Sequence, residues 1–184
     1  MTRSITDQAH DFYDAVPYEV PTPDTSLYAL LDTTARLYPD RVALDYFGAT
    51  TTYAQVRDQV LRAARVLHEA GVRAGDTVAI ALPNCPQAFV AFYACMRIGA
   101  VAAQHNPLAP AQEIAGQLAR HGGRVAVVWE KCVDAYPLDA LDTVLTVDIS
   151  VAMPASQRFL LKLPVPRARQ MRAQLRGAVP AACV

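Results

Sequence analysis

The sequence predicts an α/β fold in which a parallel or mixed β-sheet carries helices on both faces. Strand-like apolar stretches alternate with amphipathic stretches of helical period between residues 27 and 148. Residues 77–82 form an almost wholly apolar run, which is typical of a strand covered on both sides by helices. We therefore expect this strand in the middle of the sheet.

Three parts are distinguished along the 184 residues. Residues 1–26 form an N-terminal lead segment, residues 27–148 the α/β subdomain, and residues 149–184 a basic, proline-interrupted tail. Apolar residues make up 53% of the chain and charged residues 18%, which is the composition of a folded globular protein. We expect the tail to be the incomplete end of a larger domain.

The first elements after the lead segment are a helix, a hairpin and a second helix. Apolar residues recur at helical spacing over residues 26–38, and Pro39 ends that run. Residues 42–53 alternate and contain a glycine, so they predict a β-hairpin that turns near Gly48-Ala49. Thr52 and Gln55 have the spacing of a capping box, which predicts the start of the second helix.

Strands and helices then alternate. Pro86 suits the first turn of a helix that Gly99 ends, and the stretch from Ala100 to Pro107 follows as a strand and loop. Pro110 opens a fourth helix with a Gly-Gly exit, and two further strands follow, over residues 124–129 and before Asp148. The helix after Pro86 has only about thirteen residues before Gly99, too few for a membrane span of about twenty.

The charge of the chain is unevenly distributed. All seventeen acidic residues lie at or before Asp148, together with eleven basic ones, whereas six basic residues and no acidic residue follow it. A basic tail of this kind is more often simply the solvated face of a helix, but it can also contact phosphates, an anionic lipid surface or an acidic partner. After Pro166 we expect a short basic helix with Met171 and Leu175 on one side.

The first residues contain no apolar stretch of the secretory kind, and acidic residues interrupt them, so we expect a cytoplasmic protein. The cysteines show neither a C-x-x-C pair nor metal-site spacing to histidine, and we interpret them as small apolar residues: Cys85, Cys95, Cys132 and Cys183.

Two polar residues stand where a parallel sheet usually binds ligands. His105 follows one strand and Asn84 the preceding one, so both are candidates for contact with a ligand, although Asn and Pro are also common in turns. His68 and His121 lie near helix ends, where a cation is favourable, and His10 lies in the lead segment.

Common site motifs do not occur in this sequence. It contains no G-x-G-x-x-G, no phosphate-loop G-x-x-x-x-G-K-[ST], no H-E-x-x-H and no G-x-S-x-G. The missing glycine-rich turn argues against an independent flavodoxin-like nucleotide-binding domain. The tail has one aromatic residue and no recognisable nucleic-acid-binding module, so we expect no nucleic-acid partner.

An ordered series of short motifs resembles the N-terminal region of the AMP-forming acyl-CoA synthetases, an adenylating superfamily. The likeness is firm from Leu27 to Val128 and is carried by the series P-D-R-V-A, T-Y, G-V-R-A-G-D-T-V-A, L-P-N-C-P-Q, R-I-G-A-V and N-P-L. The V-V-W-E-K stretch and the tail rich in Leu and Arg look most like bacterial long-chain fatty-acid ligases.

This resemblance implies the N-terminal subdomain of an adenylate-forming ligase. Such an enzyme makes an acyl-adenylate and pyrophosphate from a carboxylate and ATP, and coenzyme A then takes the acyl group and releases AMP. ATP, Mg²⁺ and coenzyme A are therefore implied for the full-length enzyme, with fatty acid as the small-molecule substrate.

The family's phosphate loop, its Tyr-Gly-x-Thr-Glu motif, its ribose-binding Asp and its catalytic Lys do not occur in these 184 residues. We therefore assign no catalytic, cofactor-binding or metal-binding residue, and we expect a fragment that is inactive alone. The alternative is a non-enzymatic α/β module that binds a partner or a membrane surface through its basic tail. Self-association through an uncovered apolar surface is also expected.

Overall fold

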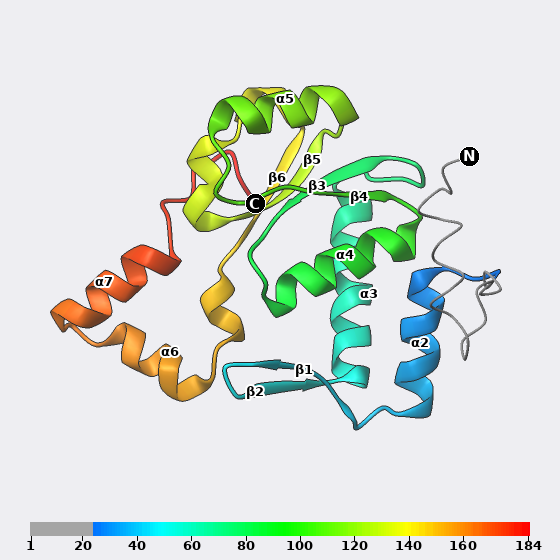
Figure 1. The fold of residues 1–184 in the computed structure, drawn as a ribbon, viewed down its shortest axis with the longest axis horizontal. Helices are drawn as coiled ribbons and strands as arrows, with labels where there is room; N and C mark the ends of the chain where they lie inside the picture. Colours follow the sequence, from blue (N-terminus) through cyan, green and yellow to red (C-terminus); the bar gives the residue numbers. More distant parts are fainter. Residues whose placement is uncertain (1–23) are drawn as a thin grey trace, which may run out of the picture.

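The computed structural model describes residues 24–184, so His10 and most of the lead segment lie outside the described residues. A four-stranded sheet has the order β4-β3-β5-β6, and β1 and β2 form a separate two-stranded sheet (Figure 1). The strands of the larger sheet are β3 (Thr77–Ala81), β4 (Val101–Gln104), β5 (Val125–Trp129) and β6 (Thr143–Val147).

All neighbouring strands of the larger sheet run parallel. In β3, Ala79 lies opposite Ala103 of β4 on one side and Ala126 of β5 on the other. The sheet is therefore parallel, the first of the two expected forms, and the apolar run over residues 77–82 does form an inner strand.

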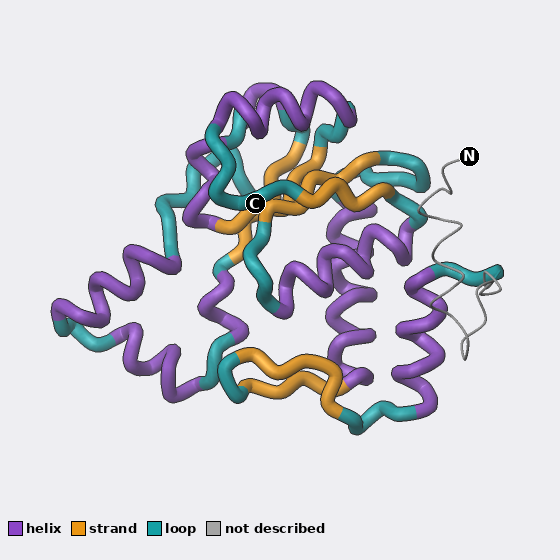
Figure 2. The backbone as a smooth tube through the Cα atoms, in the orientation of Figure 1, coloured by secondary structure: helices purple, strands orange, loops and turns teal. Residues whose placement is uncertain are grey.

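Helices cover both faces of this sheet, as the sequence predicts. Helices α3 (Tyr53–Glu69) and α4 (Pro86–Ile98) lie on one face, and α5 (Ala111–His121) lies on the other (Figure 2). The strand side chains divide accordingly. Val78 and Ile80 pack with residues of α3 and α4, whereas Ala79 and Ala81 pack with residues of α5.

Helix α4 is the apolar segment whose length argues against a membrane span. Pro86 is its first residue and Gly99 ends it with a φ of 81°, a left-handed conformation that favours glycine. Its Ala94 and Cys95 are fully buried against the sheet, and Val90 packs against α2 and α3. Within residues 24–184, no helix has both the length and the apolar character that crossing a bilayer requires.

The hairpin pairs β1 (Val42–Tyr46) with β2 (Ala49–Thr52) in antiparallel fashion. Its turn residues are Phe47 and Gly48, with φ values of 54° and 86°, so the expected turn at Gly48-Ala49 is wrong by one residue. Two successive positive φ values match the twist of a two-residue hairpin, and the Asp45 carboxylate accepts a hydrogen bond from the Gly48 amide.

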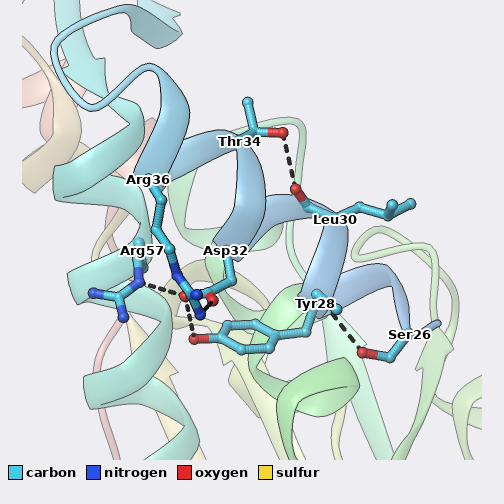
Figure 3. A network of polar contacts seen from close by, with 8 residues as sticks. Ser26, Tyr28, Leu30, Asp32, Thr34, Arg36 and Arg57 are labelled. Carbon is cyan, nitrogen blue, oxygen red and sulfur yellow. Dashed lines mark hydrogen bonds and ion pairs between the residues drawn. The ribbon is translucent and has the colours of Figure 1, made fainter.

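Helix α2 (Leu27–Leu37) is joined to α3 by a polar network around one buried carboxylate (Figure 3). The side chain of Asp32 is 10% exposed and forms ion pairs with Arg36 and Arg57. Tyr28 Oη lies 3.5 Å from the Asp32 carboxylate. The two guanidinium groups hold the pKa of Asp32 below its usual value, Arg57 having the largest effect, although burial opposes the shift.

The last part of the chain contains more structure than the sequence suggests. The 3₁₀ helices η2 (Glu130–Ala135) and η3 (Leu138–Ala140) lie between β5 and β6, and the tail itself begins with η4 (Ile149–Ala152). Helix α6 (Ala155–Lys162) was not expected, whereas α7 (Pro166–Leu175) is the expected basic helix. The chain then returns to the sheet, where Val184 exchanges backbone hydrogen bonds with Val144 and Thr146 of β6.

Replacing Thr52 by Ala is expected to lower the free energy of unfolding by about 1 kcal/mol, because it removes the N-cap of α3. Thr52 Oγ1 accepts from the Gln55 amide at 3.3 Å, and Gln55 Oε1 accepts from the Thr52 amide at 2.9 Å. Urea unfolding measures the change. Thr50→Ala, at an exposed position of β2, is the control, and equal losses in the two variants would contradict the capping role.

Replacing Asp32 by Asn is expected to destabilise the protein by about 1–3 kcal/mol, because Arg57 and Arg36 lose a buried, charged acceptor. The same urea titration at neutral pH measures this loss. Asp58→Asn, at an exposed position of α3, should change stability by no more than about 0.5 kcal/mol. A loss at Asp32 no larger than the loss at Asp58 would show that the network contributes nothing to docking α2.

Candidate functional site

The carboxyl edge of the parallel sheet is the first place to examine for a site, because open α/β sheets bind ligands where neighbouring strands send their connections to opposite faces. Strand β3 continues into α4 on one face, and β5 continues into η2 on the other. The switch point of this sheet therefore lies between the ends of β3 and β5.

The end of α7 covers the part of this edge that β5 and β6 form. Trp129 Nε1 donates to the carbonyl of Leu175 at 2.8 Å, and Lys131 Nζ donates to that of Ala173 at 2.8 Å. Arg176 forms an ion pair with Asp148. The chain passes so close that a Cβ at Gly177 would clash with the backbone carbonyl of Glu130, so glycine is required there.

Asn84, one of the two polar candidates, is exposed in the turn between β3 and α4. Its neighbour Gln87 is the more constrained residue. Gln87 Nε2 lies 3.4 Å from the carbonyl of Asp148, while Gln87 Oε1 is buried without a hydrogen-bond partner among residues 24–184. Gln87 also lines a hollow of about 520 Å³ that extends to Thr51 and Arg158.

His105, the other candidate, is 6% exposed and belongs to a chain of hydrogen bonds on the α5 face of the sheet. His105 Nδ1 lies 3.1 Å from Tyr136 Oη, and His105 Nε2 lies 2.9 Å from His121 Nε2. The Gly123 amide donates to His121 Nδ1 at 3.0 Å. None of these bonds involves Asn84, so the structure does not bring the two candidates together.

The backbone amide determines the protonation of the whole chain, because it can only donate. His121 Nδ1 must therefore be the unprotonated nitrogen, so Nε2 carries the proton and donates to His105 Nε2. His105 then carries its own proton on Nδ1 and donates it to Tyr136 Oη. Both imidazoles are neutral in this arrangement.

Burial favours the neutral form of all three side chains. It lowers the pKa of His105 and of His121, and it raises the pKa of the Tyr136 phenol. The expectation that His121 acts as a cation at a helix end is therefore wrong for this residue, since its Nδ1 accepts a hydrogen bond from Gly123 instead. His68 lies exposed on the last turn of α3, as expected.

This cluster opens into a shallow hollow of about 250 Å³, lined by Gln104, His105, Gln117, Arg120 and His121. Gln117 Oε1 is buried there without a hydrogen-bond partner in the described part of the chain. Nothing local in the sequence connects Tyr136 to His105, because they are 31 residues apart and meet only through the packing of η2 on the sheet.

The four cysteines are free thiols, and Cys85 and Cys95 are buried. Burial raises the pKa of Cys85 and raises that of Cys95 to about 11, so both thiols stay protonated at neutral pH. This supports their interpretation as small apolar residues. Between residues 24 and 184, no three His, Cys, Asp or Glu side chains gather as metal ligands would.

Replacing His121 by Gln is expected to reduce the loss of stability at acid pH. The pKa values of His105 and His121 are lowered in the folded state, so below about pH 6.5 the unfolded state binds more protons than the folded state. The folded protein therefore loses stability as the pH drops through this range. Urea unfolding at about pH 7.5 and about pH 5.5 gives this loss. His68→Gln, at an exposed position of α3, is the control, and equal losses in His121→Gln and wild type would contradict the buried hydrogen-bond chain.

The chain is similar to curated ligases that are much longer than it is. A long-chain-fatty-acid–CoA ligase of Bacillus subtilis is 28% identical over 159 residues, which is 83% of this chain and 28% of that protein. An acetyl-coenzyme A synthetase of Emericella nidulans is 49% identical over 69 residues, 34% of this chain and 10% of that protein. The chain thus spans less than a third of the length of either relative.

Solved structures agree with these relatives. The N-terminal subdomain of NpsA from Klebsiella oxytoca superposes with a TM-score of 0.60 at 30% identity, covering 66% of this chain and 30% of that one. The α/β arrangement of an adenylate-forming ligase's N-terminal subdomain is therefore confirmed. A family model described as AMP-binding enzyme matches residues 31–173, well over half of the 184 residues, so this chain belongs to the AMP-binding enzyme family.

Proposed function

We propose that this chain is the N-terminal part of an ATP-dependent fatty-acid–CoA ligase that works in the cytoplasm. The observation that carries this proposal is the extent of the likeness to the B. subtilis fatty-acid ligase, which covers 83% of the chain. The likeness to acetyl-coenzyme A synthetase is stronger in identity but covers only 34%. A match that long must extend outside the shared motifs, which favours a fatty acid over acetate as the substrate.

The proposed reaction has two steps. A carboxylate oxygen of the fatty acid attacks the α-phosphorus of ATP, and pyrophosphate leaves. The thiol of coenzyme A, after losing its proton, then attacks the acyl carbon of the adenylate, and AMP leaves. Mg²⁺ and basic groups would balance the charge that develops on the phosphates in the first step.

The described residues do not fit a nucleotide. The turn at residues 82–85 contains no glycine, and α4 begins with Pro86, which has no N–H to offer a phosphate. The amides of Ala88 and Phe89 already donate to the carbonyl of Cys85. The end of α7 covers the neighbouring strand ends: Trp129 of β5 donates to the carbonyl of Leu175, and Arg176 forms an ion pair with Asp148. We therefore route no catalytic step through these residues.

The part that this chain plays in the proposed enzyme is structural. It supplies the parallel sheet and the helices on its two faces, and no residue of this chain is assigned to ATP, Mg²⁺ or coenzyme A. The alternative of a non-enzymatic module is not favoured, because the family match covers most of the chain. Self-association remains a prediction.

The purified chain, given ATP, Mg²⁺ and a long-chain fatty acid, is expected to release no pyrophosphate above the level without fatty acid, because it has no phosphate-binding loop. A coupled pyrophosphate assay measures this, with an intact fatty-acid–CoA ligase as the positive control. Release that depends on fatty acid would contradict the structural role.

The coding sequence that follows Val184 tests the rest of the proposal. It is expected to encode the family's glycine-rich phosphate loop, and the product of the whole reading frame should release pyrophosphate faster with a long-chain fatty acid than with acetate. A longer product that prefers acetate would contradict the choice of substrate while leaving the family unaffected.

A further inference from the structure

The helical hairpin of α6 and α7 projects from the body of the molecule and carries most of the basic residues that follow Asp148 (Figure 1). On α6, Arg158 and Lys162 are four residues apart and so lie on one face, with Phe159 beside them. Arg158, Lys162 and Phe159 are all exposed. The hairpin therefore presents cationic and apolar groups together.

A groove of about 480 Å³ follows this face of the hairpin. Its basic lining consists of Arg158, Lys162, Arg172 and Arg176, and Val151 and Phe159 are among its apolar residues. Arg176 is paired with Asp148, and Arg172 donates to the carbonyls of Leu161 and Leu163. Arg158 and Lys162 form no ion pair within residues 24–184 and can bind an anion.

Exposed apolar side chains line the basic groove and a second groove of the same hairpin. Phe159 is 65% exposed and Leu160 is 56% exposed. Leu160, Val165 and Met171 line a second groove of about 560 Å³, and Arg167 is also part of its lining. Burying these exposed apolar side chains lowers the free energy only if the partner also presents an apolar surface.

We propose that the α6–α7 hairpin is a peripheral contact for an anionic phospholipid surface, with Arg158 and Lys162 binding headgroup phosphates and Phe159 entering the acyl boundary. Charge complementarity carries the proposal, because every acidic residue of the chain lies at or before Asp148. A bilayer surface combines negative charge with an apolar layer just beneath it. Helices of eight and ten residues suit a position within that interface.

Other occupants fit less well. A soluble phosphate would satisfy Arg158 and Lys162 but leave Phe159 and Leu160 in water. A nucleic acid would be expected to meet several aromatic side chains, whereas Phe159 is the only aromatic residue after Asp148. The mixture of exposed cations and exposed aliphatic side chains thus favours the lipid surface.

Co-sedimentation of the 184-residue chain with vesicles tests the proposal. Binding is expected to vesicles that contain phosphatidylglycerol, with little binding to vesicles of phosphatidylcholine alone. The double variant Arg158→Glu, Lys162→Glu should bind the anionic vesicles at least about 25-fold more weakly, since each basic residue near such a surface contributes about fivefold. Phe159→Ser should weaken the same binding by about tenfold, since it removes the inserted ring.

The matched control is Arg41→Glu, Arg62→Glu, which makes the same change in net charge at exposed positions away from the hairpin. It should retain most of the binding, and circular dichroism should show that every variant is folded. Equal binding to both kinds of vesicle, or an equal loss in the control, would overturn the proposal. Release from the vesicles by inorganic phosphate at matched ionic strength would assign the groove to a soluble anion instead, and binding to an acidic peptide without binding to vesicles would assign it to a protein.

Discussion

The fold depends on two inner strands that are buried on both faces. Four of the five residues of β3, and four of the five of β5, are buried, so neither strand has a face for solvent. Such strands require a layer of helices above and below. The two faces of β3 carry side chains of different size. Its valine and isoleucine pack against the long helices α3 and α4, whereas its alanines pack against α5. On that face, Ala79 and Ala81 pack in one cluster with Ile114 and Leu118 of α5.

Local chemistry determined most of the elements that the sequence predicts correctly. The capping box of Thr52 and Gln55, the proline at the start of α4 and the glycines that end α4 and α5 act within a few residues, and each is where expected. The misses have a different origin. Helix α6 has no side-chain cap, and Leu161 is its only buried residue. The residues that bury Leu161 cannot be recognised from the local sequence. The hairpin turn moved by one residue because Phe47 takes a positive φ, which is uncommon for an aromatic residue.

In the candidate site, too, the sequence predicts the position of a residue but not its long-range contacts. That His105 lies at the end of a parallel strand follows from the apolar run before it, and the structure agrees. Its surroundings do not follow, because Tyr136 and His121 reach it from segments 31 and 16 residues away. The tautomers depend on a backbone amide, which no side-chain pattern reveals. Similarly, two of the contacts by which the end of α7 covers β5 and β6 are made to backbone carbonyls, which every residue type carries.

The hydrogen bond between Trp129 Nε1 and the carbonyl of Leu175 allows the contact between α7 and the sheet to be followed by tryptophan fluorescence. Trp129 is the only tryptophan in the sequence, and it sits where the end of α7 meets the sheet. Its indole therefore reports on that junction and on the part of the core beside it. Emission that shifts to longer wavelength while far-ultraviolet dichroism is constant would mark the departure of the hairpin from an intact sheet. The molecule thus carries a natural fluorophore that separates the motion of its peripheral helices from the unfolding of its core.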